Sequence, residues 1–382
     1  MSVEPDDLRL IKDLRPPGRR RLAKEVPADF ESRLRGALLG RCAGCMLGSP
    51  VEMYNSGGSR SLKLMEQWAA RVGDEFPPVD YWSSVENELA MRGKLGVTRG
   101  AYSRDGLICV QPDDDIAYTI LGVLILEEFG STFSVDDVAT AWQSHVPHAA
   151  TAEAVALANL RAGVPAHEAG ERDNPYDQFI GADIRADPWG YCAPGWPERA
   201  AEMAYHDAFL THRRNGIYGS MFFAAAIAAA FVVDDPMEAL RVGLEEIPAN
   251  CQLAAAVRWA LGEAPKITDY QQANAAVSER FPDMHHVHTI NNACLTVFGL
   301  AIGGRDFSKI ISQTVAMGYD VDCTAATAGS IAGAVFGIEG VPEQWWKRFN
   351  NTVRTYLNGT QLYQIDDLVD RFAVQARRVF ED

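Results

Sequence analysis

Two short stretches of this chain set clustered aspartates directly in front of apolar segments. Asp113, Asp114 and Asp115 stand in QPDDDIAYTILG, and Asp320 and Asp322 stand in GYDVDCTAATAG. Capping of helix N–H groups is one interpretation, but it accounts for only one or two carboxylates at a helix start. Adjacent carboxylates repel each other by about 1 kcal/mol in water and by more in a buried site. Two such helix starts therefore predict an oxygen-ligand site for a hard divalent cation such as Mg²⁺.

Glu52 closes a third stretch, GSPVE, which follows a helix-like segment. A glutamate after a tight Gly-Ser-Pro turn projects from a helix end. If that end meets the aspartates, Glu52 stands where a general acid or base is needed. The alternative is a surface glutamate.

Cysteines and histidines offer two softer candidate sites. Cys42 and Cys45 form a lone C-x-x-C, but no second pair follows for zinc and no βαβ pattern surrounds it for redox work. His285, His286 and His288 have the side chains of a transition-metal site, which a carboxylate site for a hard cation does not need. We expect neither group to be functional, and an odd number of cysteines, seven, fits reduced thiols.

The charge balance excludes several classes of partner. The 382-residue chain has 35 Lys and Arg against 51 Asp and Glu, a net charge of −16. Nucleic acids and anionic membranes need clustered basic residues, so neither is an expected partner. The sequence has no run of about 18 uncharged apolar residues and no apolar signal-peptide core. We therefore expect a cytoplasmic protein.

Helical periodicity dominates the segments that must position these residues. Stretches rich in Ala, Leu, Ile and Met alternate with Gly, Pro and Asp, and strand-like alternation is nearly absent. The pattern predicts an all-α fold, a compact bundle of many helices, with residues 29–382 as a single domain. Residues 1–28 form a Pro-rich, basic arm, which we expect to be solvated or loosely packed.

Two of the predicted helices carry a small residue at every fourth position. This spacing puts each set on one ridge, where another backbone can approach closely. Glycine inside a helix costs roughly 1 kcal/mol relative to alanine, so repeated glycines indicate tight packing at the centre of the bundle. A pair of membrane helices is the alternative, but both stretches are short and their surroundings are charged. The ridges are Gly36, Gly40, Gly44 and Gly48, and Ala325, Gly329, Gly333 and Gly337.

Four stretches together resemble the ADP-ribosylglycohydrolase family, the all-α enzymes related to the dinitrogenase reductase-activating glycohydrolase. They are RGALLGRCAGCMLGSPVE (35–52), QPDDDIAYTILG (111–122), THRRNGIYGSMFFAAAIAAAF (211–231) and AMGYDVDCTAATAGSIAGAVFG (316–337), in the family's order. The resemblance implies a helical bundle that binds one or two Mg²⁺ ions, with Mn²⁺ as a substitute. It also implies a glycosidase that hydrolyses an N- or O-ribosyl bond, and paired cations suit this reaction because they orient the sugar and activate water.

The resemblance also implies roles for individual residues. Glu52 would contact water or the scissile bond, and Asp115 would be a helix cap or a supporting group. Catalysis would involve Glu52 together with one aspartate from each cluster, Asp114 and Asp320. The implied metal ligands are Asp113, Asp114, Asp320 and Asp322.

The segment FIGADIRADPWGYCAPGWP (179–197) corresponds to a Gly-rich loop that cradles phosphate and ribose in the family. An arginine suits a diphosphate, and a tryptophan in such a loop can stack on a base. Ordinary loop packing is the alternative for Trp189 and Trp196. The implied substrate is a small molecule or an ADP-ribosylated compound. The implied substrate-binding residues are Gly181, Asp183, Arg185, Trp189 and His212.

Four positions depart from the family pattern. Pro112 stands where a Thr or Ser usually precedes the aspartates, and Cys45 stands where Asp is common. Val321 and Cys323 replace two hydroxyl residues, and a thiol is a poor ligand for Mg²⁺. Thr324 would take over only after a backbone shift, because one residue rotates a side chain by about 100° along a helix. Two alternative functions follow: a catalytically silent ADP-ribose- or nucleotide-binding protein, and a same-fold enzyme acting on a small glycosylated metabolite in specialised metabolism.

Overall fold

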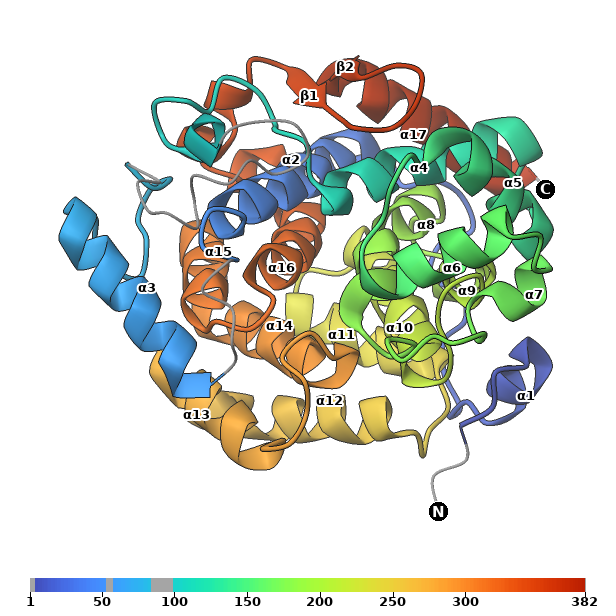
Figure 1. Cartoon of the computed structure of the whole chain (residues 1–382), viewed down its shortest axis with the longest axis horizontal. Helices are drawn as coiled ribbons and strands as arrows, with labels where there is room; N and C mark the ends of the chain where they lie inside the picture. Colours follow the sequence, from blue (N-terminus) through green and yellow to red (C-terminus); the bar gives the residue numbers. More distant parts are fainter. Residues whose placement is uncertain (1–3, 53–57, 84–98, 382) are drawn as a thin grey trace.

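The computed structural model describes residues 4–52, 58–83 and 99–381, and helices make up most of this part of the chain (Figure 1). The predicted all-α fold class is confirmed. Short 3₁₀ turns and one two-stranded ribbon connect the helices. The elements are α1 (Leu8–Asp13), α2 (Phe30–Gly48), α3 (Gly58–Val72), α4 (Asp114–Phe129), α5 (Val135–His145), α6 (Thr151–Arg161), α7 (Ala166–Ala169), α8 (Asp187–Cys192), α9 (Pro197–Phe209), α10 (Asn215–Ala230), α11 (Pro236–Gly243), α12 (Gln252–Glu263), α13 (Tyr270–Arg280), α14 (Thr289–Gly303), α15 (Phe307–Ala316), α16 (Val321–Phe336), β1 (Thr352–Arg354), β2 (Leu362–Gln364) and α17 (Ile365–Glu381).

Helices α2 and α16 carry the two ridges of small residues, and they lie side by side in the bundle (Figure 1). A Cβ atom added to a ridge glycine of α2 would come closer than 3.0 Å to the backbone of α16, a separation that real Cβ atoms essentially never show. The predicted tight packing is therefore confirmed. In the described part of the chain, no helix has the length and apolar character needed to cross a membrane. The pairs in contact are Gly36 with Gly333, Gly40 with Gly329, and Gly44 with Ala325.

The order of these pairs shows that α2 and α16 are antiparallel, and this decides which helix ends meet. Gly48, at the end of α2, lies against the backbone of Val321 and Asp322 at the start of α16. The turn that follows α2, with Ser49 and Glu52, therefore leaves the helix beside the second aspartate cluster.

Helix α10 supports the bundle from the inside. All 16 of its residues are buried, and it packs against α8, α9, α11, α14 and α16. A helix that is apolar on every side is an interior helix. Its many alanines let the surrounding helices approach closely.

The β-ribbon lies at the edge of the helical body, beside α17 (Figure 1). Thr352 pairs with Gln364, and Arg354 pairs with Leu362. Val110, which precedes the first aspartate cluster, donates its N–H to Thr352 O at 2.9 Å and accepts the Arg354 N–H at 2.9 Å. The ribbon thus holds the chain that leads into α4.

The N-terminal arm is docked against the body, whereas we expected it to be solvated or loosely packed. In its described part, Arg15 forms ion pairs with Glu198 and with the fully buried Glu246. Arg20 pairs with the same Glu246 at 3.1 Å. Burial raises the pKa of Glu246, and the two guanidinium groups oppose that rise. The basic residues of the arm therefore compensate a carboxylate that the body buries.

Candidate metal centre

The first aspartate cluster forms the start of α4. Asp113 is the capping residue, because its carboxylate accepts the N–H of Asp115 at 3.2 Å. The same carboxylate accepts the hydroxyl of Ser49, from the turn after α2, at 3.1 Å. Asp114 and Asp115 occupy the first helical turn, where the helix dipole favours negative charge. The cap is therefore Asp113, and Asp115 needs another explanation.

The second cluster forms the start of α16. Asp320 occupies the capping position, but within the described chain its carboxylate makes no capping hydrogen bond. Its N–H donates to Asn292 Oδ1 at 3.1 Å. The two preceding residues, Gly318 and Tyr319, have φ of 75° and 70°, and left-handed backbone is strained for a tyrosine. This strained turn sets the direction in which α16 begins.

The two helix starts and the end of α2 bring their side chains together. The sulfur of Cys45 and one oxygen each of Asp113 and Asp115 all lie within 4.8 Å of one another. The sulfur of Cys323 and one oxygen each of Asp115 and Asp322 form a second set with this spacing. Asp115 belongs to both sets. We call these five buried residues the inner cluster.

Two predicted ligands, Asp114 and Asp320, stand at the same helix starts but outside both sets. Asp114 is half-buried and Asp320 is 8% exposed, so both are more exposed than the aspartates of the inner cluster. Glu52 is also half-buried, and its charge helps to raise the pKa of Asp320, after burial and Asp322. Asp114, Asp320 and Glu52 therefore form the outer side of the centre.

Burial destabilises the ionised form of one carboxylate at each helix start, Asp115 in α4 and Asp320 in front of α16. It raises the pKa of Asp115 well above its usual value; Arg41 opposes this rise, and Asp113 and Asp322 add to it. Burial also raises the pKa of Asp320, with Asp322 as the next contributor. A bound cation has the opposite effect, because it stabilises the ionised form.

Arg41, in the middle of α2, is absent from the residues that the sequence predicts for the site. Its buried guanidinium contacts Asp115 Oδ1 at 3.1 Å and Asp187 Oδ2 at 2.7 Å. It also donates to Thr119 Oγ1 at 2.8 Å and to the carbonyl of Ile184 at 2.6 Å. Arg41 is thus a fixed internal cation beside the inner cluster. The sequence feature that could have identified Arg41 is that it is a single charge among the glycines and apolar residues of GALLGRCAGCMLG.

The hydroxyl groups around the centre differ from those that the resemblance implies. The hydroxyl of Thr324 donates to the Asp320 carbonyl at 2.7 Å, so it is committed to the helix backbone and does not take over from Cys323. Cys323 Sγ donates to Asp115 Oδ2 at 3.3 Å. Ser49 is the hydroxyl that reaches the cluster, and the GSPVE motif contained the signal for it.

Arg185, predicted to contact a diphosphate, is a structural cation in the interior. Its guanidinium pairs with Asp207 at 2.7 Å and with Glu153 at 2.6 Å. It also donates to the carbonyls of Gly181 and Asp207, at 3.0 and 3.4 Å, and to Thr211 Oγ1 at 2.7 Å. These contacts use all five N–H donors of an arginine, so a diphosphate contact by this side chain would require breaking them.

The other predicted substrate-binding side chains lie in the same buried region. Asp183 accepts the Thr289 hydroxyl at 2.6 Å. Trp189 lies in α8 and not in a loop, and its ring packs against the ring of Phe133 at 4.9 Å between ring centres. His212 Nδ1 lies 2.7 Å from the Thr211 hydroxyl, and burial lowers the pKa of His212 well below its usual value. Substrate binding by these residues stays a prediction.

Of the cysteine and histidine groups considered as softer metal sites, only Cys45 belongs to the inner cluster. All seven cysteines lie in the described ranges as buried thiols that form no disulfide. Burial raises the pKa of Cys42 to about 12, as for an inert thiol, whereas Cys45 belongs to the inner cluster. His285 stacks on Phe179 at 4.6 Å and on His286 at 4.2 Å. Within the described ranges, the groups with metal-ligand spacing include none of the three neighbouring histidines.

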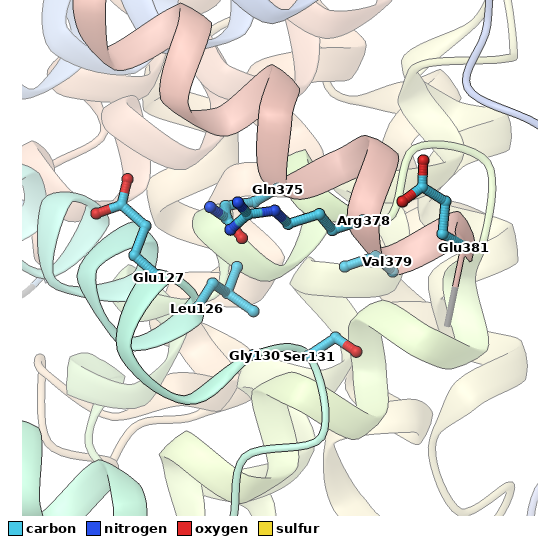
Figure 2. A pocket seen from close by; sticks show the side chains of 8 residues that line it. All are labelled: Leu126, Glu127, Gly130, Ser131, Gln375, Arg378, Val379 and Glu381. Carbon is cyan, nitrogen blue, oxygen red and sulfur yellow. The ribbon is translucent and has the colours of Figure 1, made fainter.

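A pocket of about 210 Å³ lies at the other end of α4 and is separate from this centre (Figure 2). Figure 2 shows Leu126 and Glu127 from α4 on one side and Gln375 and Arg378 from α17 on the other. Helix α4 has 16 residues, so the pocket is about 20 Å from the aspartates at its start.

Comparison with known proteins agrees with the fold and the motifs. The model of the ADP-ribosylglycohydrolase family matches residues 26–379. A solved structure of an ADP-ribosylglycohydrolase-related protein complex has a similar fold, with a TM-score of 0.55 and 17% sequence identity over 93% of this chain and 99% of that chain. No curated protein matches the chain at a significant level. Since the family model covers almost the whole sequence, the chain belongs to the ADP-ribosylglycohydrolase family.

Proposed function

We propose that the protein is a metal-dependent hydrolase that cleaves an N- or O-ribosyl bond of the ADP-ribosyl type. The family supports glycohydrolysis of this type. The observation that carries the proposal is the convergence of three helix ends: the starts of α4 and α16 and the end of α2. Buried carboxylates gathered from distant parts of a chain need a compensating cation.

The carboxylates of the centre suit Mg²⁺, whereas its two thiols do not. Carboxylate oxygens suit a hard cation, and burial raises the pKa of two of the carboxylates, Asp115 and Asp320, as in a site that a cation would stabilise. The thiols of Cys45 and Cys323 do not suit Mg²⁺. The residues that would hold the cation are Asp113, Asp114, Asp320 and Asp322, together with Asp115.

The chemistry divides between the cation and the side chains. A bound divalent cation polarises ribose oxygens and lowers the pKa of water. Glu52, half-buried beside Asp320, transfers a proton from the attacking water toward the acceptor atom. The water oxygen bonds to the anomeric carbon as the bond to the acceptor breaks. Arg41 holds Asp115 in one orientation throughout.

The direct test measures binding and turnover in the same preparation. We expect calorimetry to detect binding of Mg²⁺ or Mn²⁺ and of ADP-ribose, and we expect the enzyme to release ADP-ribose from modified arginine or serine. Binding of ADP-ribose without release would assign a silent binding protein instead. If neither binding nor release of ADP-ribose were detected, every ADP-ribose function would be overturned.

A double variant tests the metal dependence. Asp113→Asn with Asp320→Asn removes one carboxylate from each helix start and keeps the side-chain volume. It should lose both divalent-cation binding and turnover. The matched control, Asp367→Asn with Asp370→Asn, removes two exposed carboxylates from α17 and should retain both. Undiminished cation binding in the first variant would mean that Asp113 and Asp320 are not metal ligands.

A further inference from the structure

The inner cluster combines sulfur and carboxylate donors, a set that Mg²⁺ does not favour. Cys45 comes from α2, Asp113 and Asp115 come from the start of α4, and Asp322 and Cys323 come from the start of α16. We propose that this cluster binds thiophilic divalent cations of the zinc class, with one sulfur and two carboxylates as the ligands in each of its two sets. The inference rests on the proposed function in taking this cluster as part of the metal centre.

The two carboxylate oxygens of Asp115 have different partners: one contacts Arg41 and the other contacts the sulfur of Cys323. Arg41 Nη2 contacts Oδ1 at 3.1 Å, and Cys323 Sγ contacts Oδ2 at 3.3 Å. In a tetrahedral zinc site, bonds of about 2.0 Å to oxygen and 2.3 Å to sulfur separate these two ligands by about 3.5 Å. Asp115 and Cys323 therefore already stand near the spacing that zinc requires, and Arg41 keeps the carboxylate in that orientation.

Backbone packing holds the main chain of Cys45, the second cysteine, next to the same carboxylate. Cys45 follows Gly44, which lies against Ala325 of α16 without room for a Cβ atom. Its sulfur lies within 4.8 Å of an oxygen of Asp113 and of Asp115. A movement of the Cys45 backbone away from the cluster would thus have to separate two helices in backbone contact.

The donor set discriminates between cations. Mg²⁺ requires octahedral oxygen coordination and keeps several of its waters, whereas this cluster is buried and brings two sulfurs. Zn²⁺ accepts sulfur and carboxylate together in a four-coordinate site. When the cation binds, each ligating thiol releases its proton to solvent as the sulfur–metal bond forms, so no oxidant or reductant is needed.

Cobalt binding gives a test that needs no enzyme assay. Full-length protein, treated with a chelator and kept reduced, is titrated with Co²⁺. We expect a thiolate-to-cobalt charge-transfer band in the near-ultraviolet, which Zn²⁺ abolishes and excess Mg²⁺ leaves in place. The absence of this band in the wild-type protein would overturn the inference, and this result does not depend on any variant folding.

Cysteine variants then assign the sulfurs. Cys45→Ser and Cys323→Ser should each weaken Zn²⁺ binding by at least about tenfold, the low end for loss of a supporting group at a metal site, and the double variant should lose the band. The controls are Cys42→Ser, one turn earlier in α2, and Cys109→Ser, since neither residue belongs to the inner cluster. A band that persists in the double variant, or that disappears in a folded control variant, would contradict the assignment.

Turnover assays separate this inference from the proposed function. Hydrolysis supported by Mg²⁺, without a charge-transfer band, would keep the proposed function and overturn the thiophilic site. A band and zinc binding without hydrolysis under any divalent cation would support the site and overturn the proposed function.

Discussion

Gly44 in α2 lies directly against the carbonyl of Ala325 in α16, in a contact that leaves no space for a Cβ atom. The next residue, Cys45, belongs to the inner cluster. The closest approach of the two helices and the candidate metal centre are therefore at the same place, so a change in helix spacing is also a change in the centre.

Gly44→Ala should destabilise the protein by about 2–3 kcal/mol, because the new methyl group overpacks two backbones that cannot both remain in place. Urea unfolding measures the change, and metal titration should show weaker binding. Gly262→Ala is the matched control: Gly262 is also helical, in α12, but its added Cβ would meet no atom of the described residues within 4 Å. The control should gain up to about 1 kcal/mol from helix propensity, and equal losses in the two variants would contradict the packing argument.

Arg41→Met should destabilise the metal-free protein by about 3–5 kcal/mol at neutral pH, because it leaves the buried carboxylates of Asp115 and Asp187 without their cation. Addition of a divalent cation should restore part of this loss. In the control, Arg377→Met removes a more exposed ion pair with Glu31, and the expected change is below about 1 kcal/mol. If Arg41→Met behaved like the control in denaturant unfolding, Arg41 would not be compensating buried charge.

Glu52→Gln should lower kcat by about 10²- to 10⁴-fold, the range for loss of a general acid or base. Cation affinity and thermal stability should stay close to those of the wild type, because the substitution keeps the size of the side chain. Steady-state kinetics of ADP-ribose release measures the effect. Glu279→Gln, on the exposed side of α13, should leave kcat unchanged. A wild-type kcat in Glu52→Gln would remove Glu52 from the catalytic set.

His288 gives a pH dependence whose sign follows from its surroundings. Burial lowers the pKa of His288 from 6.5 to about 4, with His285 and Arg214 as further contributors. Between these values the unfolded chain binds more protons than the folded one, so the free energy of unfolding decreases as the pH falls below 6.5 toward 4. His288→Asn should therefore reduce the stability lost between pH 7 and pH 5 by about 1–2 kcal/mol.

Asparagine also keeps a side-chain acceptor for the Ile290 N–H, which His288 Nδ1 accepts at 3.2 Å. Denaturant unfolding at both pH values is the measurement. His167→Asn, at a side chain that is 69% exposed, should leave the pH dependence as it is in the wild type. An identical pH dependence in His288→Asn and the wild type would show that His288 does not carry this proton linkage.

Features with a local cause could be predicted from the sequence. Helical periodicity indicated the all-α fold, and glycines spaced by four identified the ridges, because that spacing sets the face of a helix on its own. The clustered aspartates marked two helix starts. The family motifs, read in order along the chain, indicated the family that the comparison with known proteins confirms.

The long-range ion pairs of the interior could not be predicted. Arg185 stood in a loop that matched a substrate-binding segment, yet its partners Glu153 and Asp207 make it part of the interior. In the sequence, Arg41 is an isolated charge in an apolar helix. In the structure, it pairs with two carboxylates from other helices, Asp115 and Asp187. Burial and ion pairing depend on which residues the fold brings close together. The sequence neighbours of an arginine do not determine either property.

The sequence by itself determined the helices, their small-residue faces and the carboxylates at their ends, because each of these depends on residues a few positions apart. Only the tertiary structure decided that α2 and α16 are antiparallel and that Cys323 meets Asp115 across 208 positions of sequence. The physical reason is that ligand geometry is set by the contact between two helix backbones. That contact brings the aspartates at the two helix starts together with the thiols of Cys45 and Cys323.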